Sequence, residues 1–243
     1  MTVWCRTSLQ PSLTPATSNE KFFVYDNEST DSTKSAVSKL TKADYKQFNT
    51  QSKFNDEVHV QLKNKIWKKS RGKADYVIVC DTDEILYHND LKKFLIESSK
   101  TKLTYFIPEG YDMYSEVFPT FDIENIELIT DKIKHGVYNI MYSKPILFDP
   151  HKIVEINYLP GAHQAIPMGI IKTYNSTDLK LLHYKNLSIE YVLNRVKQYR
   201  NRLSDTNIEK GYGIEYLNED DKIMTDFNNN LIKCKRVIQW KYL

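Results

Sequence analysis

The chain has 243 residues, of which 41% are hydrophobic, and Lys plus Arg exceed Asp plus Glu by three. This length suits one domain with its own core, and the nearly neutral charge balance gives no argument for a nucleic-acid partner. No window holds the roughly 20 apolar residues of a membrane span, and the first residues lack the apolar core of a signal peptide. The composition therefore predicts a cytoplasmic protein with no membrane span.

The chain begins with a segment that predicts no regular structure. Residues 1–20 carry two prolines and show neither strand nor helix periodicity, so they read as an irregular lead-in. An apolar strand over 21–25 follows, and the polar turn after it can cap a helix over about 32–40. These elements form a strand-turn-helix unit. No repeat or linker interrupts the sequence, and we expect a single domain over 1–243.

A second strand-helix-strand unit follows. Residues 58–70 predict a helix with Leu62 and Ile66 on one face, and residues 75–80 predict the next strand. A helix between two such strands implies a crossover connection in an open α/β sheet. The remaining predicted elements are helices over 91–98, 188–203 and 220–232, and strands over 103–107, 138–148, 153–158 and 179–184.

Three carboxylates follow the central apolar strand. Tyr76 to Cys80 runs directly into Asp81, Asp83 and Glu84. The carboxyl ends of buried strands are where open α/β folds bind ligands, and carboxylates are ligands that Mg²⁺ uses together with substrate phosphates. Asp-x-Asp here therefore indicates a metal that holds a phosphorylated substrate, while Glu84 has no assigned role.

Five motifs occur in order along the chain, at residues 25–31, 64–67, 74–84, 161–163 and 181–185. Together they resemble glycosyltransferase family two enzymes of the GT-A fold, in their small bacterial and large-DNA-virus members, over about residues 21–240. The resemblance implies a Rossmann-like three-layer α/β/α sandwich with a mixed, mainly parallel sheet. It also implies transfer of a sugar from a UDP-linked donor to a hydroxyl of a glycan or glycoconjugate, with inversion and with Mn²⁺ or Mg²⁺.

The same resemblance implies roles for individual donor-binding residues. Asp26 and Asn27 would face the nucleoside, and Asn64 would help to hold it. Asp81 would contact the ribose, or the metal through water, and Asp83 would bind the metal directly. Typical members begin with a further strand and helix. Here only residues 1–5 could serve as that strand, and residues 7–20 do not predict the helix, which puts the base selectivity in doubt.

A later histidine and lysine follow a second apolar run. His183 comes after Leu181-Leu182, so a strand can bring it to the same sheet edge, where it would complete a Mn²⁺ shell. Lys185 would neutralise the leaving diphosphate. A core or surface histidine and a solvated helix face remain alternatives for these residues.

The acceptor side needs a base that removes the hydroxyl proton. The region after the strand at 103–107 supplies Asp112, which we choose as the base, and Glu116, which is the second choice. His163 would contact the acceptor or donor sugar, and Tyr111 would stack on a sugar or base, against the alternatives of a turn histidine and a core tyrosine.

Two other classes of function fit the motif. In a phosphatase of the haloacid dehalogenase type, Asp81 would attack a phosphate and Asp83 would act as acid/base. In this chain the Asp-x-Asp motif begins only after 80 residues, and no clear strand precedes the later acidic residues 219–221. Both features disfavour the phosphatase class. A non-enzymatic sugar-binding module, with purely structural acids, is the second alternative.

Overall fold

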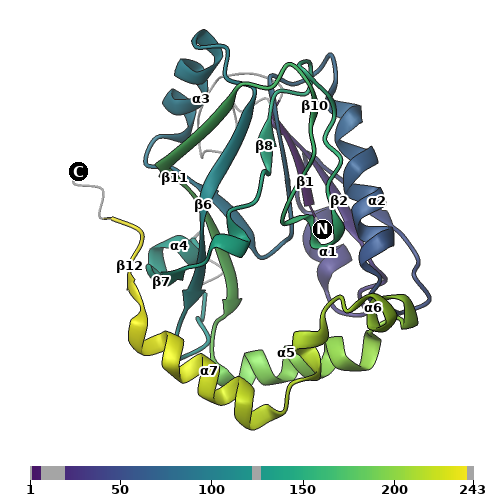
Figure 1. Cartoon of the computed structure of the whole chain (residues 1–243), viewed down its shortest axis with the longest axis vertical. Coiled ribbons are helices and arrows are strands. Elements are labelled where there is room, and N and C mark those ends of the chain that lie inside the picture. Colours follow the sequence, from purple (N-terminus) through teal and green to yellow (C-terminus); the bar gives the residue numbers. More distant parts are fainter. Residues whose placement is uncertain (1, 7–19, 122–126, 240–243) are drawn as a thin grey trace.

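The computed structural model describes residues 2–6, 20–121 and 127–239 (Figure 1). Thr2–Arg6 forms strand β1, so the start of the predicted irregular lead-in is regular structure, while residues 7–19 lie outside the described part. The other strands are β2 (Glu20–Asp26), β3 (Ala43–Gln47), β4 (Tyr76–Cys80), β5 (Glu84–Tyr87), β6 (Tyr105–Tyr114), β7 (His135–Tyr138), β8 (Leu147–Phe148), β9 (Ile153–Glu155), β10 (Met168–Gly169), β11 (Thr173–Asn186) and β12 (Lys235–Arg236).

The helices are α1 (Thr33–Ser38), α2 (Asp56–Ile66), α3 (Leu91–Lys100), α4 (Ile129–Lys132), α5 (Ile189–Arg202), α6 (Asp205–Lys210) and α7 (Asp220–Lys233), with 3₁₀ turns η1 (Trp67–Ser70), η2 (Ile140–Tyr142), η3 (Pro160–Ala162) and η4 (Ile214–Leu217). Side-chain caps explain where several of them begin. Asn55 accepts hydrogen bonds from the backbone of Glu57 and Val58 at α2, and Ser188 accepts one from the backbone of Tyr191 at α5.

The predicted three-layer sandwich with a mainly parallel sheet is wrong. The large sheet has the order β12-β7-β6-β8-β4-β1-β2-β3, with β11 paired to β6 and β5, and most of its neighbours are antiparallel. Only β2–β3 and β6–β11 pair in parallel among the described strands. The fold is mixed α/β with a nearly closed, mainly antiparallel five-strand barrel-like sheet instead of an open layer between helices.

Two short strands account for this difference. β1 lies between β2 and β4 and is antiparallel to both, and β8 lies in the same way between β4 and β6. The predicted crossover strands therefore do run in the same direction, but they do not pair with each other. β1 lies in the predicted irregular lead-in, and β8 lies at the end of the segment predicted as a strand over 138–148, so the local pattern did not show that these strands separate β2, β4 and β6.

The region predicted as one strand over 138–148 is also different. β7 ends at Tyr138, η2 follows, and the chain returns to strand only at Leu147. η2 lies directly against β6, because an added Cβ at Gly110 would meet the carbonyl carbon of Tyr142 at 2.1 Å. Glycine at this position therefore allows the close approach that places Tyr142 in the site described below.

The core packs on both sides of β4. Trp67 is fully buried and meets Phe148 edge to face, with ring centroids 5.1 Å apart. A second group of buried side chains, including Leu95 from α3 and Phe106 from β6, lies under α3. α5 and α7 pass the end of the sheet at which β6 and β11 finish (Figure 1). In the described part of the chain, no helix is long and apolar enough to cross a membrane.

Candidate functional site

A cavity of about 680 Å³ collects residues from most parts of the chain. One part of its wall, the ionic end, consists of Lys63, Asp81, Asp83, Lys144, His183, Lys185 and Arg195. Another part, the aromatic end, consists of Phe48, Phe54, His59, Tyr199 and Tyr216. The cavity therefore combines a dense set of charges with a set of rings.

Asp81 is paired with a buried lysine. The Nζ atom of Lys63 on α2 lies 2.9 Å from Oδ1 and 3.0 Å from Oδ2 of Asp81, and Lys144 Nζ lies 3.9 Å from Oδ2. Burial raises the pKa of the Asp81 carboxyl, but the two ammonium groups outweigh it and hold the pKa well below its usual range. Asp81 is therefore ionised.

Glu84 has a structural role that the sequence did not reveal. Its carboxylate accepts a hydrogen bond from the Asp81 backbone at 3.0 Å and pairs with Lys144 at 2.5 Å. The side chains of Glu84 and Lys144 are only 1% and 4% exposed. The pair therefore stabilises the turn that carries Asp81 and Asp83.

Asp83 is paired with two cationic groups. Arg195 Nη2 on α5 donates to Asp83 Oδ2 at 2.7 Å, and His183 Nε2 lies 3.3 Å from the same oxygen. Burial raises the pKa of Asp83, and its bonds to His183 and Arg195 outweigh that effect and hold the pKa well below its usual range. Asp83 is therefore also ionised.

His183 lies between two aspartates. β11 runs beside β6 with His183 opposite Asp112, and His183 Nδ1 is 3.2 Å from Asp112 Oδ1. Burial disfavours the imidazolium, but the hydrogen bonds to Asp112 and Asp83 raise the pKa of His183 above its usual value. An imidazole that donates from both nitrogens has no lone pair for a metal. Tyr142 lies against this ring, with centroids 4.1 Å apart.

The predicted metal site does not fit the arrangement of these side chains. Among the described residues, no three His, Cys, Asp or Glu side chains gather into a group that would hold a metal ion. Asp81 is held by Lys63, and Asp83 by Arg195 and His183. A divalent ion would have to displace these partners.

The two predicted bases occupy different places. Asp112 is buried beside His183, accepts a hydrogen bond from Asn139 Nδ2 at 2.7 Å and is not among the residues that line the cavity. Burial raises its pKa, but the bonds to His183 and the charge of Lys185 hold the pKa below its usual value. Asp112 is therefore placed to orient His183.

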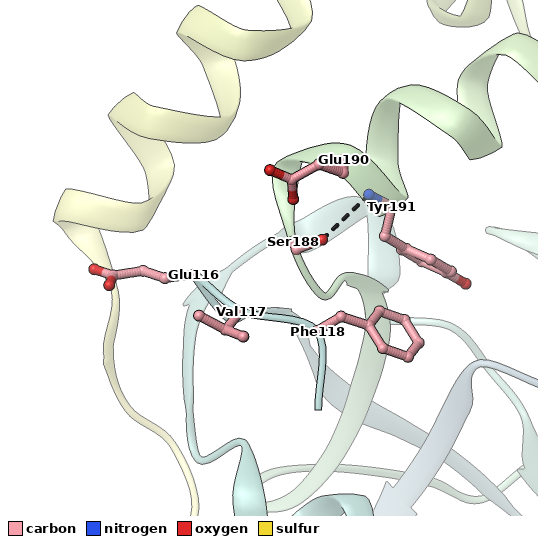
Figure 2. Close-up of a pocket in the computed structure, with 6 residues that line it drawn as sticks. All are labelled: Glu116, Val117, Phe118, Ser188, Glu190 and Tyr191. Carbon is pink, nitrogen blue, oxygen red and sulfur yellow. Dashed lines mark hydrogen bonds between the residues drawn. The ribbon is translucent and has the colours of Figure 1, made fainter. Parts of the chain in front are cut away.

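Glu116 lines a different pocket, of about 460 Å³. Figure 2 shows it with Val117 and Phe118 near the start of α5. There Ser188 caps the helix by accepting a hydrogen bond from the Tyr191 backbone N–H. Tyr191 Oη also accepts a hydrogen bond from Arg195 Nη1 at 3.0 Å, so the two pockets are neighbours.

Of the other predicted residues, Lys185 and His163 line the cavity and Tyr111 does not. Lys185 Nζ contacts Tyr142 Oη at 2.5 Å, and His163 Nδ1 lies 2.5 Å from the Met141 carbonyl. The hydroxyl of Tyr111 donates to Glu109 at 2.8 Å, and its ring packs against Tyr138.

The three residues predicted for the nucleoside use their polar atoms within the fold. Asp26 accepts hydrogen bonds from Ser29 and Tyr45 and does not line the cavity. Asn64 donates to the Tyr158 carbonyl and accepts from the Tyr158 amide.

Asn27 does line the cavity, but its amide is also engaged. It accepts from Thr50 at 2.8 Å and donates to the Lys53 carbonyl at 3.3 Å.

Two helical spacings in the sequence indicate further residues of the cavity. On α2, His59 and Lys63 are four residues apart and both reach the cavity. On α5, Tyr191, Arg195 and Tyr199 repeat every four residues, and Arg195 contacts both tyrosines. Glu215 on η4 also lines the cavity and has no counterpart among the predicted residues.

The chain matches no protein-family model and no curated protein.

Proposed function

We propose that the cavity binds a nucleotide diphosphate sugar and that the protein transfers the sugar to a hydroxyl of a glycan or glycoconjugate. The observation that carries this proposal is the chemistry of the cavity wall, which combines a cluster of fixed charges with a cluster of aromatic rings. A nucleotide sugar has the matching parts, because a flat heterocycle is joined to a charged diphosphate and a polyhydroxylated ring. The order of the five sequence motifs supports the same class.

The cations of the ionic end would bind and stabilise the diphosphate. Lys63, Arg195 and Lys185 reach the cavity from α2, α5 and β11. Preorganised donors of this kind stabilise negative charge that develops on a leaving group. Arg195 has a bidentate geometry that suits phosphate, and it reaches the cavity while bound to Asp83.

Glu215 is the carboxylate that we assign to the acceptor proton. It lines the cavity, and none of the described residues forms an ion pair with it, whereas Asp81 and Asp83 are both paired. A carboxylate without a fixed cation is the better proton acceptor, because pairing lowers the basicity of a carboxylate. Asp112 would then act by holding His183 in position.

Dependence on Mn²⁺ stays a prediction. The proposed steps use only the side chains of the cavity, since Asp81 and Asp83 have protein cations as partners. A requirement for the metal would show that Lys63 and Arg195 give up these contacts when donor binds.

A thermal-shift panel tests the function. UDP-, GDP- and CMP-linked sugars would each be added at about 100 times their dissociation constant, in one series with Mn²⁺ and in a second series with EDTA in its place. Binding to the folded state alone then stabilises it by about 2.7 kcal/mol, which corresponds to a rise in Tm of roughly 5–10 °C. No shift with any donor, or hydrolysis of a simple aryl phosphate in place of sugar transfer, would contradict the proposal.

A matched pair of variants strengthens this test. Arg195→Gln should reduce the shift with nucleotide sugars, because it removes a donor at the ionic end. Lys21→Met should leave the shift unchanged, because Lys21 pairs with Asp44 away from the cavity wall.

A further inference from the structure

The aromatic end is built from rings that meet mostly edge to face. His59 lies between Phe48 and Phe54, with centroid distances of 5.4 and 5.1 Å and interplanar angles of 77° and 86°. Phe54 also meets Tyr199 at 5.1 Å, and Tyr199 stacks on Tyr216 at 4.6 Å and 10°. A flat ligand ring can pack against such a wall, whereas a diphosphate gains nothing from it.

His59 is the polar group at this end that the fold leaves without a partner. Its Nε2 atom is buried and has no hydrogen-bond partner among the described residues. Burial lowers the pKa of His59 to about 4, so the ring is neutral near pH 7 and offers one donor nitrogen and one acceptor nitrogen. A buried polar atom without a partner is unfavourable, and a ligand that supplies one removes that cost.

The other polar side chains expected to contact the nucleoside already have partners. Asn27 is bound to Thr50 and Lys53, and Asn64 is bound to the backbone of Tyr158. Their hydrogen bonds hold the loops around the cavity together. Recognition of a base by these groups would require them to give up these hydrogen bonds, whereas His59 Nε2 has no partner to give up among the described residues.

We propose that the aromatic end binds the nucleobase of the donor and that His59 determines base specificity by hydrogen bonding to its edge. This inference rests on the proposed function. The connection between the two ends is direct, because Arg195 Nη2 contacts both Asp83 at 2.7 Å and Tyr199 Oη at 3.3 Å. A nucleotide with its base against Phe54 and His59 therefore has its phosphates on the side of Arg195.

The test compares nucleoside diphosphates with inorganic pyrophosphate by calorimetry. Wild type and His59→Phe would each be titrated with UDP, CDP, GDP and ADP, and with pyrophosphate, which has no base. We expect the preferred nucleoside diphosphate to bind about fivefold to tenfold more weakly to His59→Phe, with reduced discrimination among the four bases. Pyrophosphate should bind wild type and variant equally.

His59→Phe keeps the ring and removes an unpaired buried nitrogen, so the variant should be folded, with a Tm at or above that of wild type. His151→Phe is the control, because His151 is exposed and outside the cavity. Equal affinity of wild type and His59→Phe for every nucleotide would overturn the assignment of His59. Equal affinity of wild type for pyrophosphate and all nucleotides would overturn the base site while keeping the anion site. Failure of wild type to bind any of the probes would instead contradict the proposed function.

Discussion

The two ends of the cavity satisfy their polar groups in opposite ways. At the ionic end each carboxylate has a fixed cation, as in the pairs of Asp81 with Lys63 and Asp83 with Arg195. At the aromatic end the rings provide shape, and His59 Nε2 has no partner among the described residues. A buried charge that keeps its partner avoids the large cost of an unpaired buried charge, whereas an unpaired polar atom can gain a hydrogen bond when a ligand arrives. Under our proposals, the ionic end holds the charged part of the ligand and the aromatic end discriminates among bases.

The largest effect is expected from breaking the buried pair of Lys144 and Glu84. Lys144→Met leaves the Glu84 carboxylate buried without its cation, which should reduce the free energy of unfolding by about 3–5 kcal/mol. Urea denaturation monitored by circular dichroism measures the loss. The double variant Lys144→Met with Glu84→Gln should recover most of it, since no charge is left unpaired. A loss below about 1 kcal/mol for the single variant would show that the pair is not the support of the ionic end.

The next effect concerns Glu215, the cavity carboxylate that we assign to the acceptor proton. Glu215→Gln should reduce kcat by about 10²-fold and leave donor affinity within about twofold, because the amide keeps the shape and cannot accept the proton. Steady-state kinetics and calorimetry measure the two quantities. Asp112→Asn is the matched comparison and should have the smaller effect on kcat. If Asp112→Asn is the more damaging change, the base role passes to Asp112.

A third prediction uses the pH dependence of stability to probe the aromatic end. The pKa of His59 is about 4 in the folded state, below its usual value of about 6.5, so the unfolded chain takes up the proton first. The free energy of unfolding should therefore fall as the pH drops from about 6.5 to about 4. His59→Phe should remove about 2 kcal/mol of this fall, which urea titrations of both proteins at pH 7 and pH 4.5 would measure. Parallel pH curves for the two proteins would show that the pKa of His59 is the same in the folded and unfolded states.

The smallest effect is expected at a pair outside both ends. Lys21 and Asp44 pair at 2.6 Å, but their side chains are 39% and 46% exposed. Lys21→Met should change the free energy of unfolding by less than about 0.5 kcal/mol, because water screens exposed pairs. A double-mutant cycle on this pair, compared with a cycle on Lys63 and Asp81, would show how much burial contributes to the ionic end. Equal coupling energies in the two cycles would contradict the comparison.

Part of the site could be predicted from local pattern. The apolar run predicted a buried strand over 75–80, directly before Asp81, and β4 spans Tyr76–Cys80. The run before His183 predicted a strand that brings this histidine near Asp83, and the two side chains are in contact. Such predictions succeed because burial and alternation are recorded in neighbouring residues.

The partners of these residues could not be predicted in the same way. Asp81 pairs with Lys63, 18 positions away, and Asp83 pairs with Arg195, 112 positions away. The expectation of a metal arose from the spacing of the two acids, their place after a buried strand and the family resemblance. Nothing in that spacing shows which cations the fold brings beside them.

The sequence by itself determined where the long strands and capped helices form and which carboxylates follow β4, because these features depend on residues close together in the chain. Only the tertiary structure decided the order of the sheet, since β1 and β8 separate strands that a local pattern would pair directly. It also decided which charges are neutralised and which nitrogen of the cavity wall is left without a partner. Pairing across a sheet and across a cavity joins residues that are distant in sequence, and periodicity carries no information about such contacts.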